Sequence, residues 1–435
     1  MDYFEYKNGA LRCEDVPVED IARHVGTPVY IYSAATLLHH YRAITEAFAE
    51  LKPTVCFSVK SLGNVQVLRL LAEAGSGFDV VSGGELARVL AAGGDARKVA
   101  FAGVGKTDRE IREAIDAGIM LFNVESEQEF ENLSRLAAET GKRVRAALRI
   151  NPDVYDPATH RYTTTGKKAT KFGVDIDRAE QFFDNYGHDD NVLLDGVDMH
   201  IGSPIYSAEP YVQAIRRSLE LIDRLRAKGQ EISLLDLGGG FAADYEQGAS
   251  PLAADYAERI LPLLRGRDLQ LVLEPGRQIA CNAGVLVTTV QYVKQGGDKR
   301  FVICDAAMND MLRPALYDAE HFAYPVRLRE GERPPHRSPG YSPDGAVKVD
   351  LVGGVCETSD FLARDRMLPP MKRGDLVSVF SAGAYGFVMS SQYNARPRAA
   401  EVLVRGDWWR IVRRRETYDD LLAPETMDLP ENPAR

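Results

Sequence analysis

The chain has 435 residues, of which 45% are hydrophobic and 27% charged, so it can bury one large core or two ordinary ones. Its net charge of −10 argues against general nucleic-acid or anionic-membrane binding, but it allows a local basic pocket for one phosphate. No run of about 18 apolar residues is present, so we expect no membrane helix. Acidic residues stand where a signal peptide would need basic and then apolar ones, and we expect a cytoplasmic protein.

The cysteines are too few and too scattered to form a network of disulfide bonds. The five of them are Cys13, Cys56, Cys281, Cys304 and Cys356, an odd number without a C-x-x-C pair. This pattern disfavours both a set of disulfides and a zinc site, and it is typical of a reducing compartment. We therefore predict no metal centre.

From about residue 27 to 275, short β-branched runs alternate with amphipathic helical patterns. The predicted strands are 28–32, 54–59, 77–81, 98–102, 120–124, 144–150, 196–200, 233–238 and 269–274. Among the predicted helices is 125–141, where Ser126 and Glu129 have the spacing of a capping box. Strand and helix alternating at this rhythm indicate parallel strands covered by helices. Eight or nine such units favour a closed β/α-barrel over residues 27–280.

After about residue 280 the rhythm changes to strands joined by turns. The predicted strands are 284–295, 299–307, 347–354, 375–382, 398–406 and 408–416. We expect a second, mainly antiparallel β-domain, a barrel or sandwich, over 281–422, with residues 1–26 joining it. The Pro- and Gly-rich stretch 327–346 predicts an exposed loop, and 423–435 predicts a loose tail.

Several chemically capable groups fall at the carboxyl ends of the predicted barrel strands, where barrel enzymes place their function. They are Lys60, Asp79, His200, Ser203, the glycines Gly238, Gly239 and Gly240, and the run Glu274, Pro275, Gly276 and Arg277. Each alone has an ordinary explanation: a lysine at a strand end is usually a surface charge, and three glycines are usually a tight turn. Together on one rim they indicate a cofactor site with an anion cradle.

Two nucleotide motifs fail on inspection. The stretch AGVGKT at 102–107 is similar to the end of a P-loop, but Ala100 stands where the first glycine is required, and no G-x-G-x-x-G opens a helix after the first strand. The residues at the predicted barrel rim instead suit pyridoxal 5'-phosphate. A lysine forms the Schiff base, glycine amides hold the phosphate, and a carboxylate keeps the pyridine nitrogen protonated so that the ring accepts electrons.

Ten motifs in order resemble diaminopimelate decarboxylase, a family of the alanine-racemase fold group of pyridoxal-phosphate decarboxylases (fold type III). They are FSVKSLGN, GSGFDVVSGGEL, TKFGVDI, HIGS, LDLGGGF, LEPGR, DAAMNDMLRPALYDA, GGVCETSDFLARDR, GAYGFVMSSQYNARPRAAEVLV and RRRETYDDLL. The match runs from about residue 25 to 422, nearly the whole chain. The resemblance implies decarboxylation of meso-2,6-diaminopimelate to L-lysine, the last step of lysine biosynthesis.

The resemblance also implies roles for individual residues. Lys60 would carry the cofactor, His200 would stack on its ring, and Asp79 would lie near the ring substituents. Glu274 would face the pyridine nitrogen, while Ser203, Gly238 to Gly240 and the Glu274–Arg277 backbone would hold the phosphate. Arg277, Arg313, Tyr317, Glu357 and Tyr385 would contact the substrate, with Tyr385 also on the cofactor, and Cys356 would be the proton donor. In relatives Cys356 and Glu357 reach the pocket from the other subunit, so a homodimer with shared active sites is implied.

The chain departs from the family pattern at several positions that bear on the substrate. Leu62, Asp198, Met199, Pro204 and Ser359 replace residues that the family usually has. A related decarboxylase acting on carboxynorspermidine, ornithine, lysine or arginine is the alternative. The last three substrates lack a distal carboxylate, so the presence of Arg313 with Glu357 argues against them. A non-catalytic pyridoxal-phosphate carrier is disfavoured because Lys60, Cys356 and Glu357 are all present. The segment 156–170 is predicted to be a mobile loop.

Overall fold

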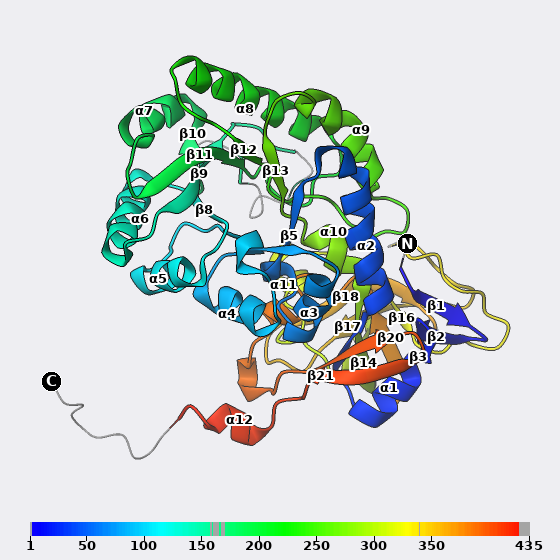
Figure 1. Ribbon diagram of the computed structural model, residues 1–435. Helices are drawn as coiled ribbons and strands as arrows, with labels where there is room; N and C mark the ends of the chain where they lie inside the picture. The colour runs from blue at the N-terminus through cyan, green and yellow to red at the C-terminus, as the bar shows by residue number, and fades with distance from the viewer. Residues whose placement is uncertain (1, 157–158, 160–164, 167–169, 339, 426–435) are drawn as a thin grey trace. The chain divides into compact units, whose positions relative to one another are not determined.

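The computed structural model describes residues 2–156, 159, 165–166, 170–338 and 340–425, and most of the predicted 156–170 loop and residues 426–435 of the predicted tail lie outside them. The chain divides into two compact units (Figure 1). The barrel unit comprises Thr36–Asp244 and Gly248–Cys281, and the β unit comprises Met1–Ala35, Tyr245–Gln247 and Asn282–Arg435. None of the described helices combines the length and the hydropathy needed to cross a bilayer.

The barrel unit is built on a closed ring of parallel strands. In chain order they are β5 (Thr54–Ser58), β6 (Gly77–Val80), β7 (Val99–Phe101), β8 (Leu121–Val124), β9 (Val144–Asn151), β11 (Val192–Met199), β12 (Leu234–Asp236) and β13 (Gln270–Leu273). Each pairs with the next, and β13 pairs back with β5, while β10 (Val174–Asp175) adds beside β9. The closed β/α-barrel that the sequence predicts is confirmed. Its strands are buried throughout most of their lengths, as expected when helices cover a parallel sheet.

Helices cover the outside of this ring (Figure 1). They are α2 (Ala34–Ala47), α3 (Val65–Glu73), α4 (Gly83–Ala91), α5 (Asp108–Ala117), α6 (Glu127–Thr140), α7 (Ile176–Tyr186), α8 (Glu209–Ala227) and α9 (Ala253–Leu264). The short, buried α10 (Arg277–Ala280) follows β13. At α6 the predicted capping box is only half formed. Ser126 accepts the Glu129 N–H, but the Glu129 carboxylate binds the Glu125 N–H and the Lys106 amine instead of returning to Ser126. The buried ammonium of Lys106 competes for that carboxylate and takes it.

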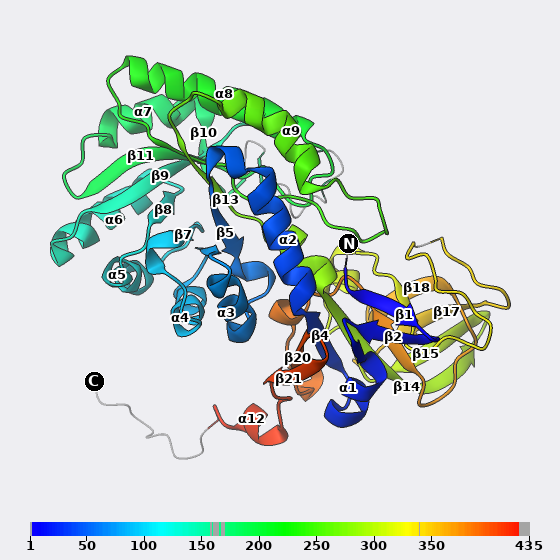
Figure 2. The same cartoon turned by 45° about the vertical axis from the view of Figure 1, so that its right-hand side comes forward.

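The β unit contains a mixed sheet in the order β18-β17-β15-β14-β4-β20-β21 (Figure 2), with a side branch that places β19 beside β14 and β16 beside β19. Its strands are β4 (Val29–Ser33), β14 (Gly284–Gly296), β15 (Lys299–Cys304), β16 (Ala323–Pro325), β17 (Val347–Val352), β18 (Phe361–Leu368), β19 (Leu376–Val379), β20 (Ala400–Arg405) and β21 (Trp408–Arg413). Most pairs are antiparallel, but β15–β17 and β4–β20 are parallel. A three-stranded sheet of β1 (Phe4–Lys7), β2 (Ala10–Cys13) and β3 (Val16–Pro17) belongs to the same unit, with α1 (Val18–Val25), α11 (Arg313–Tyr317) and α12 (Tyr418–Leu422).

One strand predicted for the barrel lies elsewhere. The run 28–32 forms β4, which pairs with β14 and β20 in the β unit, so β5 is the first strand of the barrel. All five residues of β4 are buried. A short apolar run has the same appearance whether helices or neighbouring β layers cover it, and the assignment by rhythm was therefore wrong here.

Candidate active site

Lys60 lies immediately after β5, in a short 3₁₀ turn at Val59–Ser61. Its Nζ is 2.8 Å from Oδ2 of Asp79, and its side chain is 33% exposed while that of Asp79 is fully buried. Ser58, the last residue of β5, donates a hydrogen bond of 2.6 Å to the same Asp79 oxygen. The other Asp79 oxygen is buried without a hydrogen-bond partner among the described residues. The lysine amine therefore stands at the carboxyl rim of the barrel, oriented by a buried carboxylate.

Glu274 follows β13 and shares a proton with a second buried carboxyl group. The side chains of Glu274 and Asp236 are hydrogen-bonded to each other, and Asn123 Nδ2 donates to Asp236 Oδ2 at 3.1 Å and to Glu274 Oε1 at 3.3 Å. Two buried carboxylates cannot stay in contact unless one is protonated. Burial, with the neighbouring carboxylates of Asp236, Asp79 and Asp198, raises the pKa of Glu274 well above its usual range. Burial raises the pKa of Asp236 as well, so the pair holds at least one proton between its two carboxyl groups.

A buried ion pair lies in the same layer of the barrel. Arg149 Nη1 is 3.1 Å from Oε1 of Glu125, and its Nε is 4.0 Å from Oδ2 of Asp198. Burial raises the pKa of Asp198 well above its usual range, and Asp236 adds to that rise. Asp198, one of the departures from the family pattern, thus lies beside a guanidinium at the end of β11.

Glycines 238–240 form a crowded turn after β12 that leaves no room for side chains. A Cβ on Gly239 would come within 2.3 Å of the Glu274 carbonyl oxygen. Gly240 has φ +105°, and a Cβ there would lie 2.5 Å from the Gly202 carbonyl oxygen. Only glycine fits such a turn, which brings backbone amides close to any bound anion.

His200 has a defined tautomer next to these glycines. The Gly239 N–H donates to Nδ1 of His200 at 3.2 Å, so Nδ1 accepts and the proton of the neutral ring is on Nε2. Desolvation, with the charges of Arg149 and Lys60, lowers the pKa of His200 well below its usual range. Nearby, Arg277 at the start of α10 donates from Nε to Ser203 Oγ at 3.1 Å. The imidazole ring of His200 is therefore a neutral aromatic group that can stack on a cofactor ring.

These residues fit pyridoxal phosphate. The barrel unit brings together an amine for the aldehyde, a glycine turn with a serine and an arginine for the phosphate, and a protonated carboxyl group for the pyridine nitrogen. The buried oxygen atoms Asp79 Oδ1 and Asp198 Oδ1 have no hydrogen-bond partner among the described residues. Unsatisfied buried acceptors at one rim are typical of a site that a ligand completes.

In the β unit, the predicted substrate residue Arg313 begins α11 and is 7% exposed. Its guanidinium carbon lies 5.3 Å from the ring centre of Tyr245, 5.8 Å from that of Tyr317 and 6.0 Å from that of Tyr385. Within the part of the chain that the structure describes, no carboxylate forms an ion pair with it. The structure thus brings together three predicted site residues: the rings of Tyr317 and Tyr385 lie around the guanidinium of Arg313, which has no acidic partner among the described residues.

Cys356 and Glu357 lie on an exposed turn of the β unit after β17. Asn394 Oδ1 accepts the Cys356 N–H at 2.8 Å, and the Tyr393 hydroxyl donates to the Glu357 carboxylate. Ser359, another departure, donates to the other Glu357 oxygen at 3.0 Å. The hydrogen bonds from Tyr393 and Ser359 lower the pKa of Glu357, so this group is an anion on the surface.

The remaining departures pack into the barrel unit. Leu62 and Met199 are buried, and Ser218 Oγ lies 3.4 Å from the Met199 sulfur. Pro204 follows a cis peptide bond, and its carbonyl oxygen accepts a hydrogen bond of 2.7 Å from Thr159.

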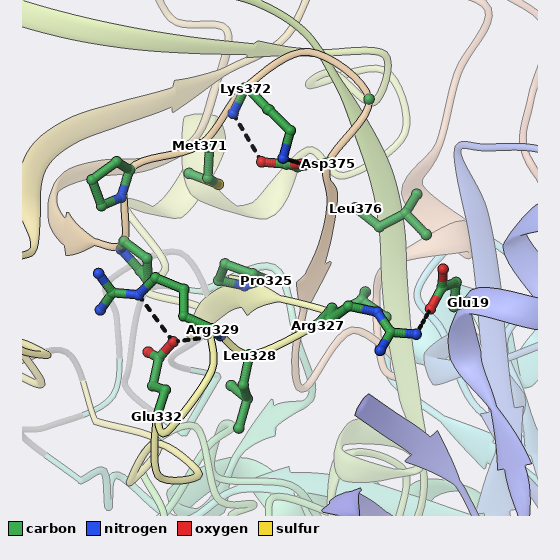
Figure 3. Close-up of a pocket in the computed structure, with 14 residues that line it drawn as sticks. Glu19, Pro325, Arg327, Leu328, Arg329, Glu332, Met371, Lys372, Asp375 and Leu376 are labelled. Carbon is green, nitrogen blue, oxygen red and sulfur yellow. Dashed lines mark hydrogen bonds and ion pairs between the residues drawn. The ribbon is translucent and has the colours of Figure 1, made fainter. Parts of the chain in front are cut away.

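A pocket of about 330 Å³ in the β unit is less suited to bind a carboxylate ligand than the surroundings of Arg313 (Figure 3). Arg327, Arg329 and Lys372 line it, but each is paired with an acid, namely Glu19, Glu332 and Asp375. None of the predicted site residues lines this pocket. Neutralised cations attract a carboxylate ligand weakly, and we assign no function to it.

The sequence prediction missed the polar layer beneath the rim, the neighbours of Arg313, and the two residues that hold the turn of Cys356 and Glu357. The missed residues are Ser58, Asn123, Glu125, Arg149, Asp236, Tyr245, His321, Tyr393 and Asn394. A signal was available for part of this set. Single polar residues interrupt otherwise apolar strands near their carboxyl ends, as Asn123 and Asp236 do, and such positions face the functional rim of a barrel.

Comparison with known proteins agrees with this chemistry. Residues 34–281 match the family model of the pyridoxal-dependent decarboxylase, pyridoxal binding domain. The chain is 50% identical over 427 residues to the diaminopimelate decarboxylase of Pseudomonas aeruginosa, covering 98% of this chain and 99% of the relative. It is 48% identical over 433 residues to that of Vibrio cholerae, covering 99% and 100%.

The solved diaminopimelate decarboxylase of Helicobacter pylori complexed with L-lysine superposes with a TM-score of 0.87 and 37% identity, covering 94% of this chain and 98% of that one. Both domains are therefore shared with solved and curated relatives. This chain belongs to the pyridoxal-dependent decarboxylases and, among them, to the diaminopimelate decarboxylase family.

Proposed function

We propose that this chain decarboxylates meso-2,6-diaminopimelate to L-lysine, the last step of lysine biosynthesis, with Lys60 as the residue that binds the pyridoxal phosphate. The observation that carries the proposal is the Lys60 amine at the barrel rim, 2.8 Å from the buried Asp79 carboxylate. Its charge also acts on the buried Glu274 carboxyl group, where it partly offsets the rise in pKa that burial causes. Bound pyridoxal phosphate supplies an aldehyde for amines and a ring that accepts the electron pair released when carbon dioxide leaves.

The residues of the barrel unit would bind and tune this group. Gly238 to Gly240, Ser203 and Arg277 would hold its phosphate with backbone and side-chain donors. The neutral ring of His200, with its proton on Nε2, would stack on the cofactor without adding a positive charge. Glu274, whose pKa burial raises, would face the pyridine nitrogen and share a proton with it.

The residues of the β unit would bind the substrate and return a proton. Arg313, with Tyr317 and Tyr385, would hold the carboxylate that is not lost, because a planar guanidinium binds a carboxylate through two hydrogen bonds. Glu357, an anion, would attract the amine at that end of the substrate. Cys356 would donate its thiol proton to the carbon from which carbon dioxide departs, forming a C–H bond as its S–H bond breaks.

We also propose a homodimer of the cytoplasm, with active sites shared between subunits. Cys356 and Glu357 are exposed on the chain, and Tyr393 and Asn394 hold their turn in place from the same chain. An exposed but well-ordered catalytic turn suits a role in a neighbouring subunit. The five free cysteines suit a reducing compartment.

The proposal is tested by carbon dioxide release from the purified protein supplied with pyridoxal phosphate. Meso-diaminopimelate, carboxynorspermidine, ornithine, lysine and arginine are compared side by side. We expect release from diaminopimelate and, in Lys60→Ala, a loss of at least a thousandfold together with the visible absorption band of the bound cofactor.

Lys142→Ala, which removes an exposed surface amine, is the matched control and should behave as the native protein. Release from another amine alone would contradict the substrate assignment. Substantial activity in Lys60→Ala would contradict the assignment of the lysine.

A further inference from the structure

The Arg313 side chain is held by a buried histidine. Arg313 Nε donates to Nε2 of His321 at 3.3 Å, and Nδ1 of His321 lies 3.0 Å from the Phe380 carbonyl oxygen. His321 is 1% exposed, and its ring meets that of Tyr245 edge-to-face at 5.3 Å between centres. Both ring nitrogens are therefore engaged inside the β unit.

These contacts define the tautomer of His321. A backbone carbonyl oxygen can only accept, so Nδ1 must carry the proton that it shares with Phe380. The lone pair of Nε2 is then free to accept the Nε–H of Arg313, which a doubly protonated imidazole could not do. His321 is thus neutral, with its proton on Nδ1, and adds no charge next to the guanidinium.

This contact decides which edge of Arg313 is available. With Nε bound to His321, a carboxylate can bind in the two-pronged manner only end-on, through Nη1 and Nη2. The rings of Tyr245, Tyr317 and Tyr385 lie near the guanidinium and support its charge through their π faces. A buried guanidinium in this setting is poised for an anionic ligand because burial without one is costly.

We propose that His321 is a positioning residue that orients Arg313 and thereby gives the site its selectivity for an amino acid with a retained carboxylate. The proposal rests on the proposed function, in which Arg313 binds that carboxylate. Loss of the His321 acceptor would let the guanidinium rotate among the three rings, and the carboxylate would lose its fixed pair of donors. A ligand without the carboxylate would be unaffected.

L-lysine and cadaverine are the probes, because they differ only in that carboxylate. Their affinities for the full-length holoenzyme are measured by spectroscopic titration for the native protein, His321→Phe, His321→Gln and Arg313→Met. In His321→Phe we expect about tenfold weaker L-lysine binding, with cadaverine binding changed less than about twofold. His321→Gln, whose amide oxygen can take the place of Nε2, should recover most of the L-lysine affinity and keeps the test valid if the phenylalanine variant does not fold.

Kinetics give a second readout. The KM for meso-diaminopimelate should rise in His321→Phe while kcat changes little, since the contact acts on binding. Equal weakening of both probes, or no weakening of either, would overturn the positioning role. The proposed function fails separately, if the native protein binds L-lysine no more tightly than cadaverine or if Arg313→Met keeps the preference.

Discussion

At the scale of single residues, the barrel rim is dominated by carboxyl groups whose charge is controlled by burial. Glu274, Asp198 and Asp236 have raised pKa values because they are removed from water and lie near one another. Glu85, at the start of α4, is another carboxyl group with a raised pKa. Burial, with the charge of Asp79, raises its pKa from 4.5 to about 7, although the Val81 N–H donates to it at 2.8 Å.

We expect Glu85→Gln to reduce the pH dependence of stability. A carboxyl group with a raised folded-state pKa contributes stability below its unfolded pKa of 4.5, and this contribution is lost as the pH rises through about 7. The amide stays neutral and can keep the Val81 hydrogen bond. Thermal unfolding at about pH 5 and about pH 8 should show the variant more stable by about 1–3 kcal/mol at the higher pH only.

Glu110→Gln is the matched control with the opposite sign. Hydrogen bonds from Gly83 and Thr107 lower the pKa of Glu110, so its charged form stabilises the fold above its unfolded pKa. Its replacement should destabilise the protein at about pH 8, by roughly 1 kcal/mol, and much less in acid. A Glu85→Gln profile parallel to that of the native protein would contradict the raised pKa of Glu85.

At the scale of elements, the segment from Lys60 to α3 connects the site to the scaffold. Asn64, 7% exposed, caps α3 by accepting the Gln66 N–H at 3.0 Å. The chain after Lys60 is therefore held by the capped start of α3, which lies four residues further on. Asn64→Ala should cost about 1 kcal/mol of unfolding free energy, whereas Asn64→Ser, which can cap, should recover most of it. Denaturant titration of both variants checks this, and equal losses would contradict the capping role.

The strand β4 shows why some elements escape prediction from sequence. Its apolar run indicates a buried strand, and that prediction is confirmed. Its sheet is decided by hydrogen bonds to β14 and β20, whose residues lie more than 250 positions further along the chain. Pairing partners at that separation leave no local pattern, so rhythm alone placed this strand in the barrel.

At the scale of the whole molecule, the proposed dimer makes a prediction that no single chain can satisfy. Lys60→Ala and Cys356→Ala should each be nearly inactive alone. If Cys356 of the partner subunit completes each site, refolding the two variants together should restore roughly a quarter of native activity, since half of the dimers are hybrids with one intact site of two. Activity assays of the mixture, with each variant treated alone as control, check this. No recovery from confirmed hybrid dimers would contradict shared sites.

The closed barrel and the β-rich second half could be predicted from the sequence, because both follow from local periodicity. The family could be recognised from the resemblance of ten motifs in order. Lys60, Asp79, His200, the three glycines and Glu274 could be named from the chain alone. The sheet that β4 joins, the proton shared by Glu274 and Asp236, and the contact of His321 with Arg313 depend on how distant segments fold together. Those features arise from hydrogen bonds between distant segments and from the removal of water around them, and neither is written in the order of neighbouring residues.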